Sequence, residues 1–483
     1  MVRLYAHDHR TASARGSADG PALMHREAAG LLAASGLPVV WHDLAMGPSG
    51  VAGAGPGDTV YAGAGPYAYL HHLWRRRAGA GYRIVREVNT ALWSGHWAQE
   101  ELCGPLVQPG DLVLFPTEYA RRLYMRHFPA SVTEETSAVA RPMLDLLPAR
   151  RPARRVPPPD RPLCIGYLGA LHEAENFDQV LSVFARCHRE SGGRTTLRYA
   201  GGGPGGPRWE PGRIAAEAAG AGVDPAAVRP AGVLGRDRLT EFFAEIDVLL
   251  FPSTSSRESL GRAVVEALAH GVPVLAADIG PAAELLPARN LVPAALDTAG
   301  RFTMDRAVPM ARVDELALTA KLLARDFDPA VLAEPERYTT GTFLRTLTGS
   351  PVRRPAPGPS AVRDRLTVAP RAGAPPIPAP AAARAATWPA GPERALARAL
   401  ERAEAFFTAY FTRLDHRVLL TAIENTPGLP DPAALRDLVR RPHRDLADHR
   451  AFPRLLDALV LPPLSYGFEP GPAGNRRPGG TGG

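Results

Sequence analysis

Short apolar runs alternate with segments of helical periodicity over residues 1–350. Apolar runs bounded by turn residues predict strands, and apolar positions three and four residues apart predict helices. The predicted strands are Val2–Ala6, Leu37–Leu44, Thr59–Ala62, Tyr82–Val88, Leu112–Pro116, Leu163–Gly169, Thr196–Ala200, Val228–Val233, Ile246–Phe251 and Val272–Ala276. The predicted helices are Ala22–Ser35, Phe177–Glu190, Asp237–Ile246, Leu260–His270 and Arg337–Leu347, the last expected to close the second domain. This alternation indicates an α/β fold with parallel sheets.

Changes in composition suggest the domain boundaries. The predicted segments are an α/β domain at 1–150, a second α/β domain at 151–349, a linker rich in Pro, Ala and Arg at 350–390, a helical extension at 391–466 and a disordered tail at 467–483. A stretch rich in Pro and Arg at 141–161 has the composition of an interdomain connection. In the extension, Phe406, Phe407, Tyr410 and Phe411 recur at helical spacing, which is typical of a helix packed in a core.

The chain has 483 residues and a net charge of +7, and Lys321 is its only lysine. This charge suits anionic ligands such as nucleotides, but equally a membrane surface or nucleic acid. Only charge supports nucleic acid, so we expect no such partner. The three arginines after Trp74 favour a solvated helix end over contact with a membrane surface, which stays the weaker alternative.

The cysteines and the apolar segments bear on location. The three cysteines show neither metal-ligand nor disulfide spacing, so we expect no metal site and a reducing compartment. No window of the chain is apolar enough to predict a transmembrane helix, and the first residues are too polar for a signal peptide. A cytoplasmic location is therefore expected.

The most informative stretch is 251–284, which reads as a strand, a small polar loop, a helix and a second strand. Gly271 and Pro273 supply the usual stop signals after the helix. A helix N-terminus offers unpaired N–H groups and a partial positive charge, and small residues let an anion approach them closely. Ser259 and Gly261 are such residues at the predicted helix start.

Glu258 and Glu266 stand at the start of this helix and two turns into it. Glu258 is suited to accept hydrogen bonds from hydroxyls of a bound ligand, and Glu266 from a ribose or the next part of a long ligand. A glycosidase pair is the alternative, but eight helical residues span about 12 Å. Glycosidase carboxylates lie about 5–9.5 Å apart, which disfavours that alternative.

The stretch resembles the donor-site signature of retaining glycosyltransferases of the GT-B fold, of the family 4 or glycosyltransferase group 1 type. The shared pattern is FPS at 251–253, Glu258, and EALAHGVPV at 266–274. The resemblance implies two Rossmann-like domains that face each other across a cleft. It also implies that Glu258 contacts the donor sugar and Glu266 the nucleotide ribose. The backbone of Ser259, Leu260 and Gly261 would hold the diphosphate, and Val233 would lie near the base.

One departure concerns the first loop of the second domain. The family pattern has Gly-Arg and then a Lys, whereas this chain has Gly169-Ala170 and Glu175-Asn176. One charge at about 4 Å and an effective dielectric near 20 is worth about 4 kcal/mol, so the loss matters for a diphosphate. We hypothesise that Arg262 or Arg257 takes over this role, and Arg262 is equally compatible with a solvated helix position.

The first domain shows the resemblance more weakly. The glycine pair of the family's first loop is replaced by Asp19-Gly20-Pro21, which leaves Gly20 as the acceptor-side candidate. The histidine expected after the fourth strand is missing, and Arg86, Glu87 and Asn89 are the candidates there for an acceptor-side site. His96 is the nearest histidine, and we interpret it as a surface residue.

The resemblance implies transfer of a sugar from a nucleotide-diphosphate donor to an acceptor with retention of configuration. The acceptor would be a small molecule, a glycan or a lipid-linked molecule, with no metal and no cofactor beyond the nucleotide-sugar co-substrate. The missing cations favour an alternative: a degenerate, non-catalytic GT-B domain that binds a sugar nucleotide or a partner enzyme. A GT-B enzyme with other chemistry, such as an epimerase or phosphorylase, is a third hypothesis. Oligomeric state is left open.

Overall fold

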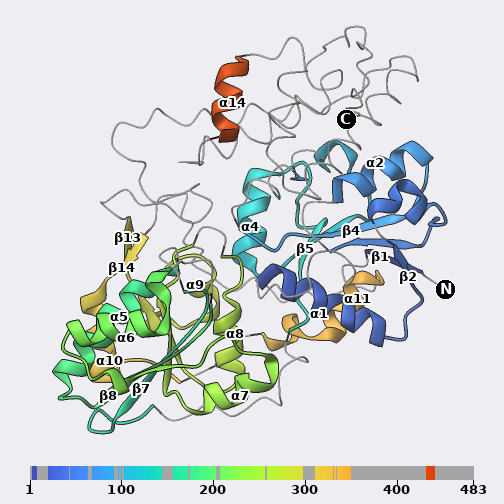
Figure 1. Cartoon of the computed structure of the whole chain (residues 1–483). Coiled ribbons are helices and arrows are strands. Elements are labelled where there is room, and N and C mark those ends of the chain that lie inside the picture. Colours follow the sequence, from blue (N-terminus) through green and yellow to red (C-terminus); the bar gives the residue numbers. More distant parts are fainter. Residues whose placement is uncertain are drawn as a thin grey trace, which may run out of the picture.

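Two α/β domains, each built on a six-stranded parallel sheet, form the structure, a computed structural model (Figure 1). The structure describes residues 3–7, 20–42, 44–63, 68–91, 96, 99–100, 103–143, 156–171, 175–202, 207–255, 258–296, 311–329, 331–332, 334–349 and 431–440. The predicted α/β fold with two Rossmann-like domains is confirmed. Of the expected helical extension, the structure describes α14 (Pro432–Arg440), and the apolar stripe at 406–411 lies outside the described residues.

The sheet of the first domain has the order β2-β1-β3-β4-β5-β6. Its strands are β1 (Leu4–His7), β2 (Val39–His42), β3 (Thr59–Ala62), β4 (Arg83–Glu87), β5 (Leu112–Phe115) and β6 (Ser137–Val139). Its helices are α1 (Gly20–Ala34), α2 (Ala68–Ala78) and α4 (Glu118–His127). Every predicted strand of this domain is confirmed, with ends that shift by at most two residues, and among its described strands only the short β6 was not predicted.

The sheet of the second domain has the order β12-β11-β10-β7-β8-β9. Its strands are β7 (Leu163–Leu168), β8 (Thr195–Ala200), β9 (Val228–Pro230), β10 (Val248–Phe251), β11 (Val274–Ala277) and β12 (Leu291–Val292), beside a small hairpin of β13 (Ala294–Leu296) and β14 (Ala311–Val313). Its helices are α5 (Phe177–Glu190), α6 (Pro211–Gly220), α7 (Arg236–Ala244), α8 (Arg262–Ala269), α9 (Ala282–Leu285) and α10 (Glu315–Ala324). This is the Rossmann strand order, which reverses direction between β7 and β10.

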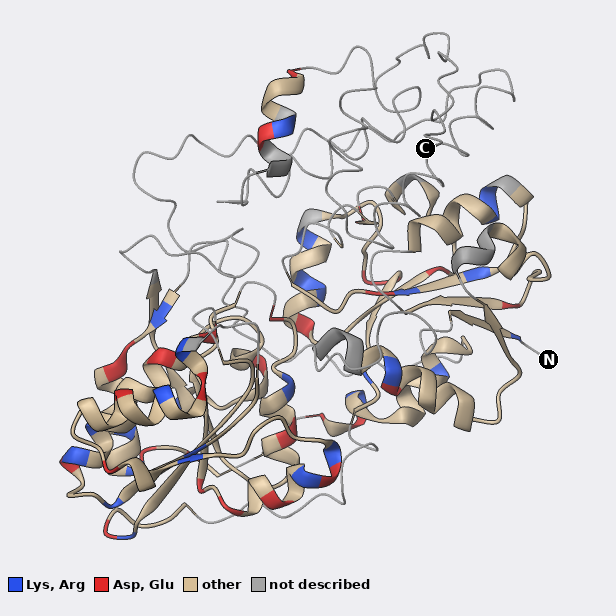
Figure 2. Ribbon diagram, viewed as in Figure 1, with Lys and Arg blue, Asp and Glu red and all other residues tan. Residues whose placement is uncertain are grey.

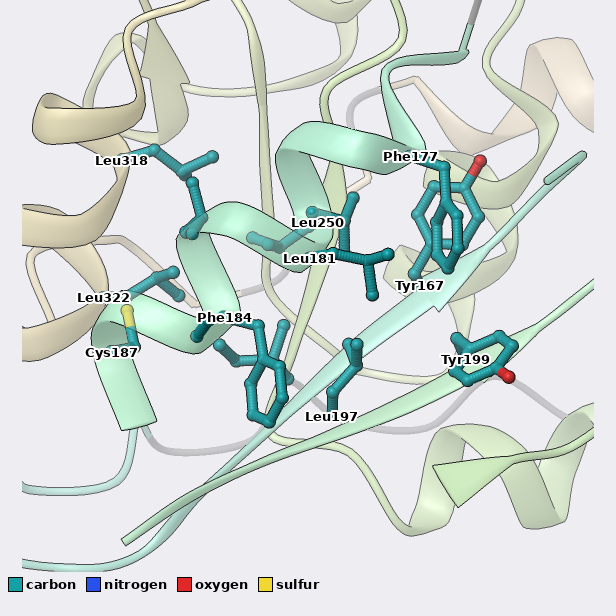
Figure 3. Close-up of a cluster of buried hydrophobic side chains, with 14 of the residues drawn as sticks. Tyr167, Phe177, Leu181, Phe184, Cys187, Leu197, Tyr199, Leu250, Leu318 and Leu322 are labelled. Carbon is teal, nitrogen blue, oxygen red and sulfur yellow. The ribbon is translucent and has the colours of Figure 1, made fainter. Parts of the chain in front are cut away.

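Helix α5 shows how the sequence builds the core of this domain (Figure 3). Its apolar residues recur three and four positions apart, so one face carries Phe177, Leu181 and Phe184 onto strands β7 and β8. Helix α10 covers the other side of α5 with Leu318 and Leu322. Each fully buried side chain of this kind contributes about 1.5–3 kcal/mol to folding. The result is a rigid sheet whose loops carry the candidate site.

Helix α11 (Thr340–Leu347) does not close the second domain, contrary to the expectation from sequence. It packs beside α1 on the first domain (Figure 1), where Phe343 and Leu347 join the core under β1, β3 and β4. The Phe343 ring meets the Tyr61 ring edge to face at 5.7 Å. The apolar side of a helix must pack against a core, and the apolar side of α11 packs against the core of the first domain.

We expect Phe343→Ala to lower the free energy of unfolding of the first domain by about 3–5 kcal/mol, because Phe343 is fully buried and its removal leaves a cavity. Urea unfolding followed by tryptophan fluorescence measures the change. The control is Leu316→Ala on α10, where the side chain is 66% exposed and the expected change lies within about 0.5 kcal/mol. Equal stability of the two variants would contradict the docking of α11 on the first domain.

Candidate functional site

The candidate donor site lies at the reversal point of the second sheet. In open parallel sheets, ligands bind beyond the carboxyl ends of the strands at such a point. Here the loops that follow β7 and β10 meet there. Asn176 joins them, because its side-chain amide donates to the carbonyl of Pro252 and to the hydroxyl of Thr254, both at 2.9 Å. Its left-handed backbone (φ 55°) lets α5 begin directly after this contact.

The start of helix α8 already holds a carboxylate. Oε1 of Glu258 accepts hydrogen bonds from the backbone N–H groups of Gly261 (2.7 Å) and Leu260 (3.4 Å). Gly261 has φ +71° and a Cβ there would lie 3.2 Å from Val264, so glycine is required at this turn. The expected amide site for an anion is therefore formed, and Glu258 occupies it. Arg257 lies outside the described residues.

Glu266 lies one layer behind this turn and is buried. The Nε of Arg262 donates to its carboxylate at 2.7 Å, and the Arg262 guanidinium also pairs with Glu27 of helix α1 at 2.8 Å and 3.1 Å. Burial raises the pKa of Glu266, and the charge of Arg262 opposes that rise. Burial lowers the pKa of Arg262, but the two carboxylates outweigh burial and raise it overall. Arg262 thus bridges the two domains in this structure.

The remaining donor-side candidates line the strand ends nearby. Gly169 follows β7, and its carbonyl would lie 1.8 Å from a Cβ at Gly201, so the two loops approach each other at backbone distance. Val233 is 59% exposed, although it is apolar, and its Cγ2 lies against Gly202. An exposed apolar side chain beside a glycine loop is suited to contact a flat ring.

Glu87 is the centre of a buried polar cluster at the carboxyl edge of the first sheet. Its carboxylate accepts hydrogen bonds from the Tyr61 hydroxyl, from Asn89 at 3.1 Å and from Arg141 at 3.0 Å, and it lies 4.0 Å from Nδ1 of His25. Burial lowers the pKa of His25 well below its ordinary value, and Arg141 and the neighbouring histidines lower it further. The imidazole of His25 is therefore held in its neutral form.

A small hollow opens beside this cluster. It lies where the first sheet reverses direction, between β1 and β3, and is lined by Ala6, His7, His25, Ala29, Leu32, Trp41, Tyr61 and Gly63. Helix α1, which supplies His25, begins at Gly20. Tyr61 belongs both to the lining of the hollow and to the Glu87 cluster, so the two lie side by side.

Arg141 is a functional candidate that the sequence did not reveal. The Pro-rich and Arg-rich composition around it indicated a solvated linker, yet Arg141 is 2% exposed and contacts both Glu87 and Asn89. Its backbone N–H donates to the carbonyl of Arg337, where the chain returns to the first domain. The available signal was its position directly after the last strand of an α/β domain, where ligand-binding residues gather.

Arg86 is not brought to this cluster. Neighbouring strand residues point to opposite faces, so Arg86 faces away from Glu87 and pairs with Glu100 through two hydrogen bonds of 2.9 Å and 2.7 Å. Arg86 and Glu100 are both buried. The expectation that His96 lies on the surface was wrong: His96 is 2% exposed, and its Nδ1 lies 2.7 Å from the Thr90 hydroxyl.

Charged residues of both signs are interspersed over the two domains in the view of Figure 2. Within the part of the chain that the structure describes, no cluster of three or more His, Cys, Asp or Glu side chains is placed to hold a metal ion. None of the described helices has the length and apolar character needed to cross a membrane.

Comparison with known proteins gives a family match for part of the chain. Residues 162–300 match the family described as glycosyl transferases group 1. No curated protein shows a significant sequence match. The matched residues contain Glu258, Glu266 and the loops that meet at the reversal point, so the sequence match and the candidate donor site coincide.

Several solved structures are similar to this chain at low sequence identity. They include HepE of Anabaena in complex with UDP, with 15% identity over 72% of this chain and 93% of that chain and a TM-score of 0.47. The pneumococcal O-GlcNAc transferase GtfA in complex with UDP and GlcNAc has 13% identity over 58% and 51%, with a TM-score of 0.41. TarM of S. aureus has 12% identity over 63% and 57%, with a TM-score of 0.42.

We expect Glu100→Gln to cost about 3–5 kcal/mol of unfolding free energy, because it leaves the buried charge of Arg86 without its partner. Chemical denaturation measures this cost. Glu217→Gln is the control, since Glu217 and its partner Arg208 are each 46% exposed and such pairs are worth about 0–1 kcal/mol. A Glu100→Gln variant as stable as the control would show that the Arg86 pair is not structural.

Proposed function

We propose that the protein is a glycosyltransferase that transfers a sugar from a nucleotide-diphosphate donor to an acceptor. The observation that carries the proposal is the occupied amide site at the start of α8. Two backbone N–H groups there already donate to a carboxylate oxygen, and they could donate to a diphosphate oxygen in the same way. The site lies within the segment that matches the glycosyltransferase group 1 family.

The donor is proposed to bind along the carboxyl edge of the second sheet. Its diphosphate displaces the Glu258 carboxylate from the amides of Leu260 and Gly261, and the freed Glu258 accepts hydrogen bonds from sugar hydroxyls. Glu266 takes the ribose hydroxyls, and the base lies near Val233. Gly169 and Ser259 belong to the loops after β7 and β10, which meet at the reversal point, and are proposed to contact the donor there.

The reaction is proposed to proceed with retention and without a metal. The leaving phosphate would take the acceptor proton, so the protein acts by positioning and by stabilising charge. We propose Arg262 and the neighbouring Arg257 as the cations that replace those absent at Ala170 and Glu175. Arg262 has two carboxylate partners, so contact with phosphate requires it to exchange one of them.

The acceptor is proposed to bind at the carboxyl edge of the first sheet, beside Glu87 and Asn89. The hollow at the reversal point of this sheet and the neutral imidazole of His25 support this assignment. Small molecules, glycans and lipid-linked molecules all remain candidates. A cytoplasmic location stays a prediction.

A non-catalytic domain that binds a sugar nucleotide or a partner enzyme is the second candidate. The observation that favours it is the charge balance of the donor side. Glu175 stands where a cation is expected, and Arg262 is neutralised by Glu27 and Glu266. Such a domain would bind the nucleotide without transferring its sugar.

The first test is a thermal-shift panel of UDP-, GDP-, ADP- and dTDP-sugars on the wild type and on Glu266→Ala. A donor at about 100 times its dissociation constant adds about 2.7 kcal/mol of stability. We expect one base to stabilise the wild type and to lose its effect in Glu266→Ala. The control is Glu241→Ala on α7, an exposed glutamate. Absence of any shift in the wild type would contradict nucleotide binding, and binding without sugar release on incubation would favour the second candidate.

Arg262→Ala tests the replacement of the missing cations. We expect at least a tenfold loss of affinity for the nucleoside diphosphate, since a phosphate partner and the support of Glu266 are lost together. Arg236→Ala is a matched control, because Arg236 also pairs with Glu27, whereas the hydrogen bond to Glu266 comes from Arg262. Calorimetric titration with the nucleotide identified in the panel measures both variants, and unchanged affinity in Arg262→Ala would exclude Arg262 from the donor site.

A further inference from the structure

Ser259, in the middle of the candidate donor loop, is held by the other domain. Its carbonyl accepts a hydrogen bond of 2.6 Å from the hydroxyl of Thr117, and its own hydroxyl donates one of 2.6 Å to the carbonyl of Asn89. Thr117, Ser259 and Asn89 are all buried. The loop that is proposed to bind the diphosphate is therefore fixed by two hydrogen bonds to the first domain.

The hydrogen bond to the Ser259 carbonyl also orients the neighbouring amide. The carbonyl of Ser259 and the N–H of Leu260 belong to one planar peptide group and point in opposite directions. Holding the oxygen on the side of the first domain therefore directs the N–H to the opposite side. That N–H is one of the two that bind the Glu258 carboxylate in this structure.

Thr117 is suited to this task by its position and its chemistry. It follows β5 and caps helix α4, where its hydroxyl oxygen accepts from the backbone N–H of Ala120 at 3.3 Å. A hydroxyl has one proton to donate in addition to its acceptor sites, and here that proton goes to Ser259. Capping alone needs only an acceptor, so the donated hydrogen bond is a separate property of this residue.

A second contact fixes the same helix end to the second domain. The carboxylate of Glu284, on α9, accepts from the backbone N–H groups of Glu118 (3.0 Å) and Tyr119 (2.8 Å). A carboxylate is favoured at this end of a helix by the partial positive charge of the unpaired N–H groups. Thr117 is thus held in a defined position relative to the donor loop.

We propose that Thr117 of the first domain is a positioning residue for the donor diphosphate, because its hydroxyl fixes the peptide group between Ser259 and Leu260. The inference rests on the proposed function of the α8 start. It means that donor binding favours the arrangement in which the two domains are joined at this loop. By linkage, separating the two domains weakens donor binding by the factor by which the donor favours the joined arrangement.

The test compares the affinity of UDP, or of the diphosphate identified in the panel, for Thr117→Val and Thr117→Ser. We expect about a tenfold loss in Thr117→Val, equivalent to about 1.4 kcal/mol, and near wild-type affinity in Thr117→Ser, which keeps the hydroxyl. Binding of the matching nucleoside, which lacks phosphate, is expected to be unchanged in both. A general loss of structure would weaken both ligands, so this difference identifies positioning of the phosphate.

Thr339→Val is the matched control, since Thr339 caps α11 with its hydroxyl and has no hydrogen bond to the donor loop. If Thr117→Val does not fold, Thr117→Gly replaces it, because glycine is tolerated at a helix cap. Wild-type UDP affinity in the folded variant would overturn the inference and leave the proposed function intact. Failure of the wild type to bind any nucleoside diphosphate would overturn both.

Discussion

The backbone N–H groups of Leu260 and Gly261, which have no acceptor within helix α8, set the constraint on which this part of the structure depends. They are buried at the meeting of two domains, and buried donors without acceptors are costly. The chain meets this cost internally, because the left-handed turn at Gly261 lets the Glu258 carboxylate fold back onto them. An anionic ligand at these groups, such as the proposed diphosphate, would have to displace the Glu258 carboxylate.

The same logic explains the charges between the domains. Each domain contributes a carboxylate to the other. Glu27 of the first domain pairs with Arg262, and Glu284 of the second accepts hydrogen bonds from the first N–H groups of α4. A buried ion is tolerated when it is paired and hydrogen-bonded, so each contact is self-consistent without ligand. These contacts join the two domains and give their buried charges and helix-end N–H groups partners.

The sequence predicted most strands and the helix that becomes α8 well because those signals are local. Apolar runs, the spacing of α5 and the stop signals at Gly271 and Pro273 all act within a few residues. It predicted the partners of charged residues poorly because those depend on the fold. The alternation of strand residues would have separated Arg86 from Glu87, but nothing local to Arg141 indicates burial. The apolar residues of α11 likewise indicate that the helix packs against a core, but they do not indicate which domain provides it.

The two candidate sites share one segment of chain, which joins their chemistry. Strand β4 ends at Glu87, the centre of the first-domain cluster, and two residues later the Asn89 carbonyl holds the Ser259 hydroxyl. Asn89 also contacts Glu87 and Arg141 through its side chain. A ligand that shifts the Glu87 cluster therefore acts on the peptide that fixes the donor loop. Coupling between two binding sites is reciprocal, so the proposed donor at the start of α8 and a ligand at the Glu87 cluster would affect each other's binding by the same free energy.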